Sequence, residues 1–336
     1  MAKQQVLFRA DGDSKMGLGH VVRSLALVDM LKSEFSCSFA ITCPTREVLA
    51  MLKNSCDHII ELADLDDATF LNCLKGNEIV IIDGYHFSSE LGSKIRKRAF
   101  RLAAIEDECR DWESADMVIN FGLATPALTA TQNGSTRLLL GLKYLIVRSC
   151  FISSAKQERS LTTITTAFIC MGGADPFNVT LKAFNACTRT SFITRINIVV
   201  GSAYVHEDMV CYSKLSGKNV HVYRSITASE MATLISTSDI ALTTASSIAL
   251  EACCVKTGLI IGTVADNQQN IHDNLLANGC CISIGDWRSA SVEQIIDCIN
   301  AIGEVSVVQT MVNRQKDIID GLSDQRILGE FKKMTC

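Results

Sequence analysis

The 336-residue sequence lacks the features that direct a chain to nucleic acid or into a membrane. No block of lysine and arginine is long enough to follow a nucleic-acid backbone, and the net charge is −4. The basic run KIRKR at 94–98 is short and isolated, which is typical of a solvated helix face. No run reaches the roughly 18 apolar residues of a membrane helix, and the first residues do not have the pattern of a signal peptide. We therefore expect no nucleic-acid partner and no membrane insertion.

The sequence also lacks the cysteine patterns of a metal site or a redox motif. It contains 15 cysteines, but none form C-x-x-C, and no cysteine and histidine grouping has zinc spacing. Many of them lie inside apolar runs such as ALEACCV and GCCISI, where a free thiol behaves as a small buried hydrophobe. This usage is typical of a reducing compartment without disulfides. We expect a cytoplasmic protein with no metal and no cofactor.

The order of apolar and amphipathic segments predicts the fold class. A length of 336 residues is long for one domain and favours two. Short apolar runs such as QVLFRA and EIVIID alternate with segments of helical period, which is typical of βαβ units. The alternation stops at 138–167, which we interpret as a connection, and then starts again. We predict an α/β fold with two Rossmann-like doubly wound domains facing across a cleft.

The same pattern sets the expected domain boundaries. We expect an N-terminal Rossmann-like domain at 1–150 and a C-terminal nucleotide-binding domain at 160–314, with the helices at about 315–336 packing back on the first domain. In such folds ligands bind outside the carboxyl ends of the strands. The residues that directly follow predicted strands are therefore the candidate site residues.

A histidine stands behind two glycines just after the first predicted strand. Gly17 and Gly19 permit a tight turn and the close approach of a ligand, and His20 follows in the first turn of a helix. This is not the dinucleotide fingerprint, because the position of its third glycine holds Val22. The positive end of the helix disfavours an imidazolium, so a neutral His20 could accept a proton as a general base. The alternative is a histidine that only satisfies backbone groups of a loop.

Other polar residues lie close to this histidine in the sequence. Arg9, Asp11 and Arg23 are placed on the strand end, the loop and the helix, where they could orient His20 or contact an anion. Asp11 is the better candidate for the orienting residue. Tyr85 follows Asp83 at the end of another predicted strand, where it lines the cleft or is a surface aromatic.

The second half of the chain has two candidate anion sites at strand ends. Gly172 and Gly173 lie between a strand and a helix, where exposed N–H groups bind phosphate. Ser246 and Ser247 lie at the start of another helix, and Glu251, one turn further on, could accept hydrogen bonds from a ribose diol. The alternatives are an ordinary turn, a plain helix cap and a solvated glutamate.

A third strand end offers amide groups. Asn267 and Gln268 follow the strand GLIIGT and suit sugar hydroxyls or acetamido groups, although a polar helix cap explains them equally well. Taken together, the first domain carries a candidate base, and the second carries two anion sites and a candidate ribose acceptor. This combination predicts a nucleoside diphosphate on the second domain, with its attached group pointing at His20.

Five segments fall in the order and spacing of one known family: FRADGDSKMGLGHVVRSLAL, LLGLKYLIVR, ICMGGADPFNVT, TTASSIALEA and DNQQN. The sequence resembles the PseG-type UDP-2,4-diacetamido-2,4,6-trideoxy-β-L-altropyranose hydrolases of pseudaminic acid biosynthesis, here called the altropyranose hydrolases. The likeness runs from the first strand to the tail. It implies a GT-B fold related to that of the peptidoglycan N-acetylglucosaminyltransferase, with water as the acceptor.

The resemblance also implies roles for individual residues. His20 matches the catalytic histidine that activates water for attack on the anomeric carbon, with inversion and without a metal. The residues that match the nucleotide side are Gly172, Gly173, Ser246, Ser247 and Glu251. Asn267 and Gln268 match the sugar side. The segment DGYHF departs from the family, which more often has a histidine before the tyrosine and a small residue after it, so the match carries over Tyr85 but not its neighbours.

We therefore expect an inverting, metal-independent UDP-sugar hydrolase that acts as a monomer on a small-molecule substrate. The nearest alternative is a GT-B glycosyltransferase that moves an amino sugar from a UDP-sugar to a hydroxyl acceptor. A further alternative from another class is a non-catalytic nucleotide-sugar-binding protein.

Overall fold

The computed structural model describes residues 3–12, 18–107, 110, 112–122, 136–206 and 217–335. The chain divides into two compact units. The first unit comprises Met1–Ser149 and Leu322–Cys336, and the second unit comprises Cys150–Gly321. The second domain expected from the sequence, 160–314, lies within the second unit.

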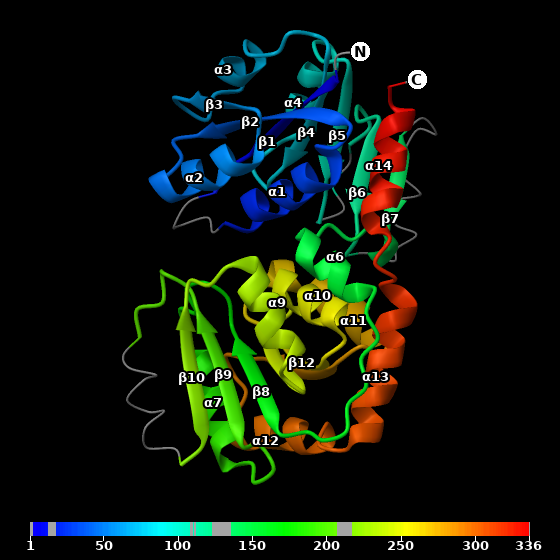
Figure 1. Ribbon diagram of the computed structural model, residues 1–336. Helices are drawn as coiled ribbons and strands as arrows, with labels where there is room; N and C mark the ends of the chain where they lie inside the picture. Colours follow the sequence, from blue (N-terminus) through cyan, green and yellow to red (C-terminus); the bar gives the residue numbers. More distant parts are fainter. Residues whose placement is uncertain are drawn as a thin grey trace. The chain divides into compact units, whose positions relative to one another are not determined.

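The first unit is built on a seven-stranded parallel sheet in the order β3-β2-β1-β4-β5-β6-β7 (Figure 1). Its strands are β1 (Gln4–Ala10), β2 (Phe35–Thr42), β3 (His58–Leu62), β4 (Glu78–Asp83), β5 (Arg101–Ile105), β6 (Met117–Asn120) and β7 (Arg137–Leu140). Its helices are α1 (Gly19–Leu31), α2 (Arg46–Ser55), α3 (Asp67–Leu71), α4 (Ser89–Arg96), the 3-10 turn η1 (Leu142–Tyr144) and α14 (Ser323–Lys333). All six residues of β4 are buried, as expected for an apolar run in the middle of a parallel sheet.

The strand order of the first sheet reverses at β1, which pairs with both β2 and β4. Ala10 and Asp83, the last residues of β1 and β4, are in register. Helix α1 begins shortly after β1 at the same edge of the sheet. This reversal is the switch point at which open α/β sheets bind their ligands.

The connection expected at 138–167 contains regular structure that the sequence pattern missed. It begins within β7, which pairs with β6, and it includes α6 (Ser149–Ala155). The interpretation of the whole segment as a connection was therefore wrong. The reason is that β7 has only four residues at the edge of the sheet, too few to produce a recognisable alternation.

The C-terminal helix α14 belongs to the first unit. The ring of Phe331 packs edge-on against Phe35, with 6.3 Å between ring centroids. Glu330 accepts two hydrogen bonds from the guanidinium of Arg137, at 3.0 and 3.1 Å. The chain thus returns to its first unit after completing the second.

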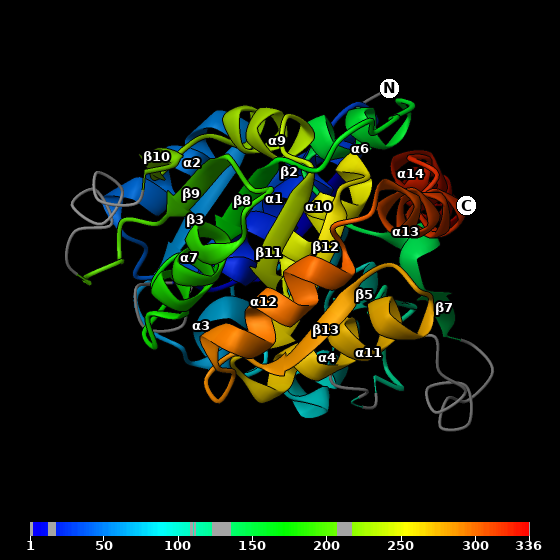
Figure 2. The same ribbon diagram turned by 90° about the horizontal axis from the view of Figure 1, so that it is seen from below.

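The second unit is built on a six-stranded parallel sheet in the order β10-β9-β8-β11-β12-β13. Its strands are β8 (Thr166–Cys170), β9 (Arg195–Val200), β10 (Asn219–Arg224), β11 (Ile240–Thr244), β12 (Gly258–Thr263) and β13 (Ile282–Asp286). Its helices include α7 (Val179–Arg189), α9 (Ala228–Ser236), α10 (Ser247–Val255), α11 (Gln269–Ala277), α12 (Val292–Ala301) and α13 (Val305–Ile318), and α7 and α12 lie side by side (Figure 2). The order reverses at β8, which pairs with β9 and β11, so this unit also has a switch point.

Among the described residues, no single helix is both long and apolar enough to cross a membrane. One pair of helical segments, Val292–Ala301 and Val305–Lys333, meets this condition by length and composition only when its two parts, bent by 83°, are taken together.

Candidate functional site

His20 lies in the first turn of α1, as the sequence predicts. The helix begins at Gly19, and the residue before it, Leu18, makes no side-chain capping bond. Among the described residues, a Cβ atom added at Gly19 would meet nothing within 4 Å. Gly17, the other predicted glycine, lies outside the described residues.

A buried carboxylate fixes the orientation of the His20 imidazole. His20 Nδ1 lies 2.7 Å from Asp83 Oδ1, and the Asp83 side chain is 1% exposed. Burial by itself raises the pKa of Asp83, but the charge of Arg23 and the hydrogen bonds from Arg23 and His20 hold it below its usual value. Asp83 is therefore ionised and accepts the Nδ1 proton. The Nε2 lone pair of His20 remains available to accept a proton from water.

The expectation that Asp11 orients His20 is wrong, because Asp11 belongs to the other face of the sheet. Side chains alternate along a strand, and the side chain of Asp83 lies on the face covered by α1. Asp11 lies on the same face as Arg9, whose guanidinium is stacked over Phe70 and Phe87. Two neighbouring strands thus end in carboxylates that serve opposite faces.

Asp11 organises a separate cluster on its own face. Its carboxylate accepts hydrogen bonds from Arg9 Nη1 at 2.6 Å, the Thr42 amide at 2.8 Å and His86 Nε2 at 3.0 Å. Burial raises the pKa of Asp11, but the hydrogen bonds from His86 and Arg9 and the charge of Arg9 outweigh it and hold the pKa well below its usual range. Arg9 is thereby placed as a partner of Asp11 rather than of His20.

Arg23 joins the predicted base to a second carboxylate. It donates to Asp83 from Nε at 2.9 Å and from Nη2 at 2.5 Å, and its Nη1 donates to Asp107 at 2.6 Å. Burial lowers the pKa of Arg23, but the charges of Asp107 and Asp83 raise it well above its usual value. Because Arg23 is shared between two carboxylates, it neutralises Asp83 only in part. Its Nη2 also lies 3.2 Å from His20 Nδ1, so the guanidinium and the imidazole share the carboxylate of Asp83.

Tyr85 packs against His20. The two rings meet edge to face with 4.6 Å between centroids, and the Tyr85 hydroxyl lies 3.4 Å from Asp107 Oδ2. The tyrosine is 38% exposed, so it presents part of its ring to solvent. The structure therefore brings together three residues predicted for this site, His20, Arg23 and Tyr85.

The loop that carries Tyr85 is held in place by Arg110. This guanidinium donates to the carbonyl oxygens of Gly84 at 3.1 Å, Tyr85 at 2.9 Å and Phe87 at 2.7 Å. It also donates to Glu106 Oε2 at 3.0 Å, and the Glu106 side chain is fully buried. Arg110 is not predictable from the sequence, because its partners are backbone carbonyl oxygens of a distant segment, which leave no sequence pattern.

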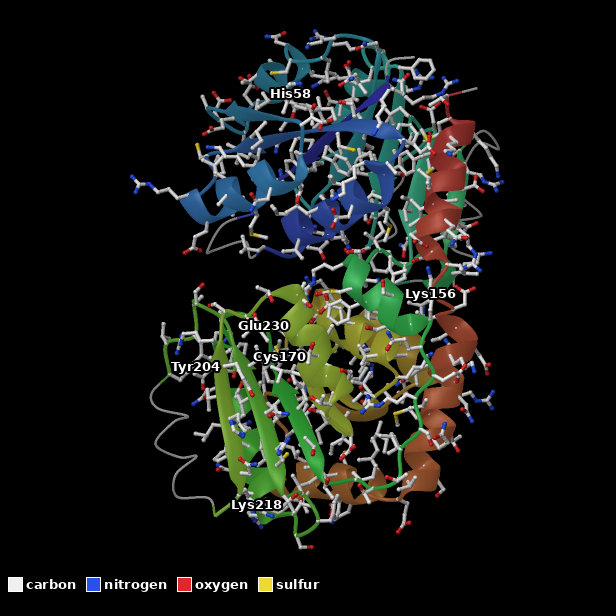
Figure 3. The ribbon with its side chains drawn as sticks, viewed as in Figure 1. His58, Lys156, Cys170, Tyr204, Lys218 and Glu230 are labelled. Carbon is white, nitrogen blue, oxygen red and sulfur yellow. The ribbon has the colours of Figure 1, made fainter. Side chains whose placement is uncertain are left out.

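In the second unit, a glycine turn follows β8 at the edge marked by Cys170 and Tyr204 (Figure 3). Gly172 adopts φ +93°, a conformation that favours glycine. The N–H groups of Gly172 and Gly173 donate to no acceptor within the part of the chain that the structure describes. A Cβ atom added at Gly201 would lie 2.4 Å from the carbonyl oxygen of Gly173, so the turn is packed tightly against the end of β9.

The start of α7 differs from the expectation of a phosphate site. The buried carboxylate of Asp175 accepts hydrogen bonds from the N–H groups of Val179 at 2.9 Å and Thr180 at 2.8 Å. These donors are already satisfied within the protein. Only the Gly172–Gly173 turn keeps the character of an anion site here.

The start of α10 supports the second predicted anion site. Ser246 occupies the cap position but makes no capping bond, and its hydroxyl pairs with Thr244 Oγ1 at 3.0 Å. Ser247 is exposed as the first residue of the helix. Glu251 is 5% exposed, which excludes the interpretation of a solvated helix residue.

The amide pair after β12 divides between two roles. Asn267 is exposed in the 3-10 turn η2 (Asp266–Gln268). Gln268 turns back, and its Oε1 accepts a hydrogen bond from the Val264 amide at 2.8 Å. Gln268 occupies the position before α11 but makes no side-chain capping bond, so its amide serves the loop, while Asn267 remains a candidate for sugar contact.

The described residues contain no group of three or more histidine, cysteine, aspartate or glutamate side chains arranged to hold a metal ion. The carboxylates at the end of the first sheet are instead bound by arginine and histidine.

The two parallel-sheet units have the GT-B fold, and comparison with solved structures agrees. MurG of Acinetobacter baumannii superposes with a TM-score of 0.68 at 12% identity, covering 98% of this chain and 99% of that one. The UDP-GlcNAc 2-epimerase of Neisseria meningitidis superposes with a TM-score of 0.67 at 13% identity, covering 98% and 100%. At these identities the likeness establishes the fold alone.

Sequence comparison confirms the resemblance to the altropyranose hydrolases. The chain is 24% identical over 282 residues to the UDP-2,4-diacetamido-2,4,6-trideoxy-β-L-altropyranose hydrolase of Campylobacter jejuni, covering 82% of this chain and 97% of that one. It is 23% identical over 284 residues to the spore coat polysaccharide biosynthesis protein SpsG of Bacillus subtilis, covering 82% of each.

A third relative is an uncharacterised protein of Methanocaldococcus jannaschii, 26% identical over 282 residues. This match covers 79% of the present chain but only 57% of the archaeal protein. No family model matches the chain.

Proposed function

We propose that this protein hydrolyses UDP-2,4-diacetamido-2,4,6-trideoxy-β-L-altropyranose to UDP and the free sugar, a reaction of pseudaminic acid biosynthesis, with inversion at the anomeric carbon and without a metal. The observation that carries the proposal is the pair of His20 and buried Asp83, 2.7 Å apart, at the switch point of the first sheet. The similarity to the C. jejuni hydrolase supplies the substrate class.

His20 is the general base in this reaction. As a water oxygen bonds to the anomeric carbon, one water proton passes to Nε2 and the bond from the anomeric carbon to the phosphate oxygen breaks on the opposite face. The bonding electron pair leaves with UDP, and the anomeric configuration inverts. The carboxylate of Asp83 stabilises the imidazolium that forms, and Arg23 holds that carboxylate in place. UDP is a good leaving group, so a positioned base contributes more than a strong acid.

The second unit binds the nucleotide. The free N–H groups of the Gly172–Gly173 turn and the start of α10 at Ser246 suit the oxygens of a diphosphate. Glu251 is the proposed acceptor for the ribose hydroxyls, and Asn267 the proposed contact to the sugar. We propose that the enzyme acts as a monomer and needs no macromolecular partner.

Incubation of the protein with the UDP-sugar alone tests the proposal, with UDP and free sugar measured separately. Release of both in equal amounts without an added acceptor supports hydrolysis, and proton NMR of the first product formed gives the anomeric configuration. Turnover that requires a hydroxyl acceptor would make the protein a glycosyltransferase. Tight binding without turnover would make it a nucleotide-sugar-binding protein.

A further inference from the structure

The first unit holds a second histidine in a fixed orientation, and the proposed reaction does not use it. Asp11 is ionised and its side chain is 1% exposed, so His86 must donate the proton on Nε2 to it. In the neutral imidazole, the Nδ1 atom of His86 then carries a lone pair that can accept a hydrogen bond. The imidazole is 37% exposed, which leaves it accessible to a ligand.

The loop around His86 is held in place by contacts to its backbone and to its side chains. Arg110 binds three carbonyl oxygens of residues 84–87, and Phe87 is buried beneath the loop at 4% exposure. The rings of His86 and Phe87 lie 3.9 Å apart between centroids. A loop fixed at both backbone and side-chain level holds Tyr85 and His86 in place before a ligand arrives, and such preorganisation lowers the cost of binding.

Gly84 leaves room for the rings of His86 and Phe87. A Cβ atom at residue 84 would lie 3.1 Å from His86 Cε1, 3.2 Å from its Nδ1 and 2.9 Å from Phe87 Cε2. The imidazole of His86 therefore covers the place where a side chain of residue 84 would begin. The imidazole thus packs over the backbone of residue 84 and is held there by Asp11.

The charges around His86 suit a hydrogen-bonding role. Arg9 donates to Asp11 and to the neutral hydroxyl of Thr42, so this carboxylate has a full positive partner. The cluster is already neutral before His86 is counted. Asp11 therefore needs a hydrogen bond from His86 and not a second positive charge.

We propose that His86, oriented by Asp11, contacts the substrate and accepts a hydrogen bond at Nδ1 from an N–H or O–H group of the sugar. This inference rests on the proposed function and assigns a specificity-determining residue to it. His86 selects for a sugar that carries a donor at one position. It takes no part in the transfer of the water proton.

The test compares His86→Gln with the wild type. A glutamine amide can still donate to Asp11 from the place of Nε2, but it lacks the acceptor at the place of Nδ1. We expect His86→Gln to raise KM about 2- to 15-fold, the effect of one lost hydrogen bond, with kcat, UDP affinity and the thermal unfolding midpoint close to wild type. His58→Gln is the matched control, because His58 is exposed at the first residue of β3, at the opposite edge of the sheet (Figure 3).

Substrate analogues identify the group that His86 recognises. The UDP-sugars to be compared differ from the full substrate by one acetamido or one hydroxyl group. One analogue lacks the group that His86 recognises. The wild type should bind this analogue more weakly than the substrate, whereas His86→Gln should bind the analogue and the substrate equally. The inference would be overturned by equal KM values for wild type and His86→Gln. It would also be overturned if every analogue lost the same affinity in both proteins, and either result would leave hydrolysis intact. A wild-type protein that neither binds nor cleaves the UDP-sugar would instead refute the proposed function, and the inference with it.

Discussion

The two sheets have the same switch-point topology but end in different chemistry. The first strand edge, where β1 and β4 end, carries the ionised side chains Asp11 and Asp83, each bound by an arginine and a histidine. The second strand edge, where β8 and β11 end, carries a glycine turn and serine and threonine hydroxyls. Proton transfer needs charged groups held in place, whereas a diphosphate can be bound by backbone N–H groups. The same architecture thus divides the proposed reaction into two tasks.

The sharpest test of this comparison removes the base from the first strand edge. His20→Asn should lower kcat about 10²- to 10⁴-fold, the usual contribution of a general base. The affinity for UDP, measured by calorimetry, should be nearly unchanged because the proposed nucleotide site lies in the second unit. His58→Asn should retain full activity. A His20→Asn variant that keeps most of its kcat would place the base elsewhere, with Tyr85 the next candidate, since Asp11 is already bound by three donors.

A second test asks whether the first strand edge is stabilised by its charges. Asp11→Asn leaves the buried guanidinium of Arg9 without its carboxylate, and we expect a loss of about 3–5 kcal/mol in the free energy of unfolding at pH 7. Because the folded pKa of Asp11 is depressed, its stabilisation is present above the unfolded value of about 3.9 and is lost as the pH falls below it. The difference between wild type and variant should therefore shrink in urea titrations near pH 3.

The control for this test is Asp29→Asn, which breaks the more exposed pair of Asp29 and Lys32 and should cost at most about 1 kcal/mol. A loss from Asp11→Asn as small as that of the control would mean that the buried cluster does not stabilise the first unit.

A weaker effect is expected at the second strand edge. Glu251→Ala should weaken UDP binding by about 1–3 kcal/mol, the range for a charged hydrogen bond or a buried group left unpaired. Glu251→Gln keeps the shape of the side chain, so it distinguishes the effect of the lost charge from the effect of lost packing. Calorimetry with UDP, together with thermal unfolding of each variant, measures the two effects. Unchanged UDP affinity in Glu251→Ala would remove this residue from the nucleotide site.

The smallest effect is expected from chelation. Turnover of the UDP-sugar should remain within about twofold after treatment with EDTA, because charged side chains and N–H groups take the roles that a metal would otherwise fill. A loss of turnover that magnesium or manganese restores would show that the second strand edge needs a cation to bind the diphosphate.

Local sequence patterns predicted most of the fold, because each buried strand is a short apolar run and each helix has a regular period. They also placed His20 in the first turn of α1. They could not determine which carboxylate reaches it, since Asp11 and Asp83 both follow apolar strands. That choice depends on the register of β1 with β4 and on which face each side chain occupies. Asp83 ends an apolar strand, so its position could have suggested a role beside His20. No local sequence pattern predicts the contacts of Arg110, or that Asp175 binds the N–H groups at the start of α7.

The return of α14 to the first unit has a consequence for the order of folding. Lys332 on this helix pairs with Glu34 at 2.7 Å, a contact that spans 298 residues of sequence. During synthesis the first unit emerges from the ribosome long before this helix, so the surface around Phe35 stays uncovered while the whole second unit is made. The first unit is thus the first to begin folding and the last to be completed. A chain that ends before residue 322 would contain the whole second unit but an incomplete first one, and we expect such a chain to be more sensitive to proteolysis and aggregation than the full chain.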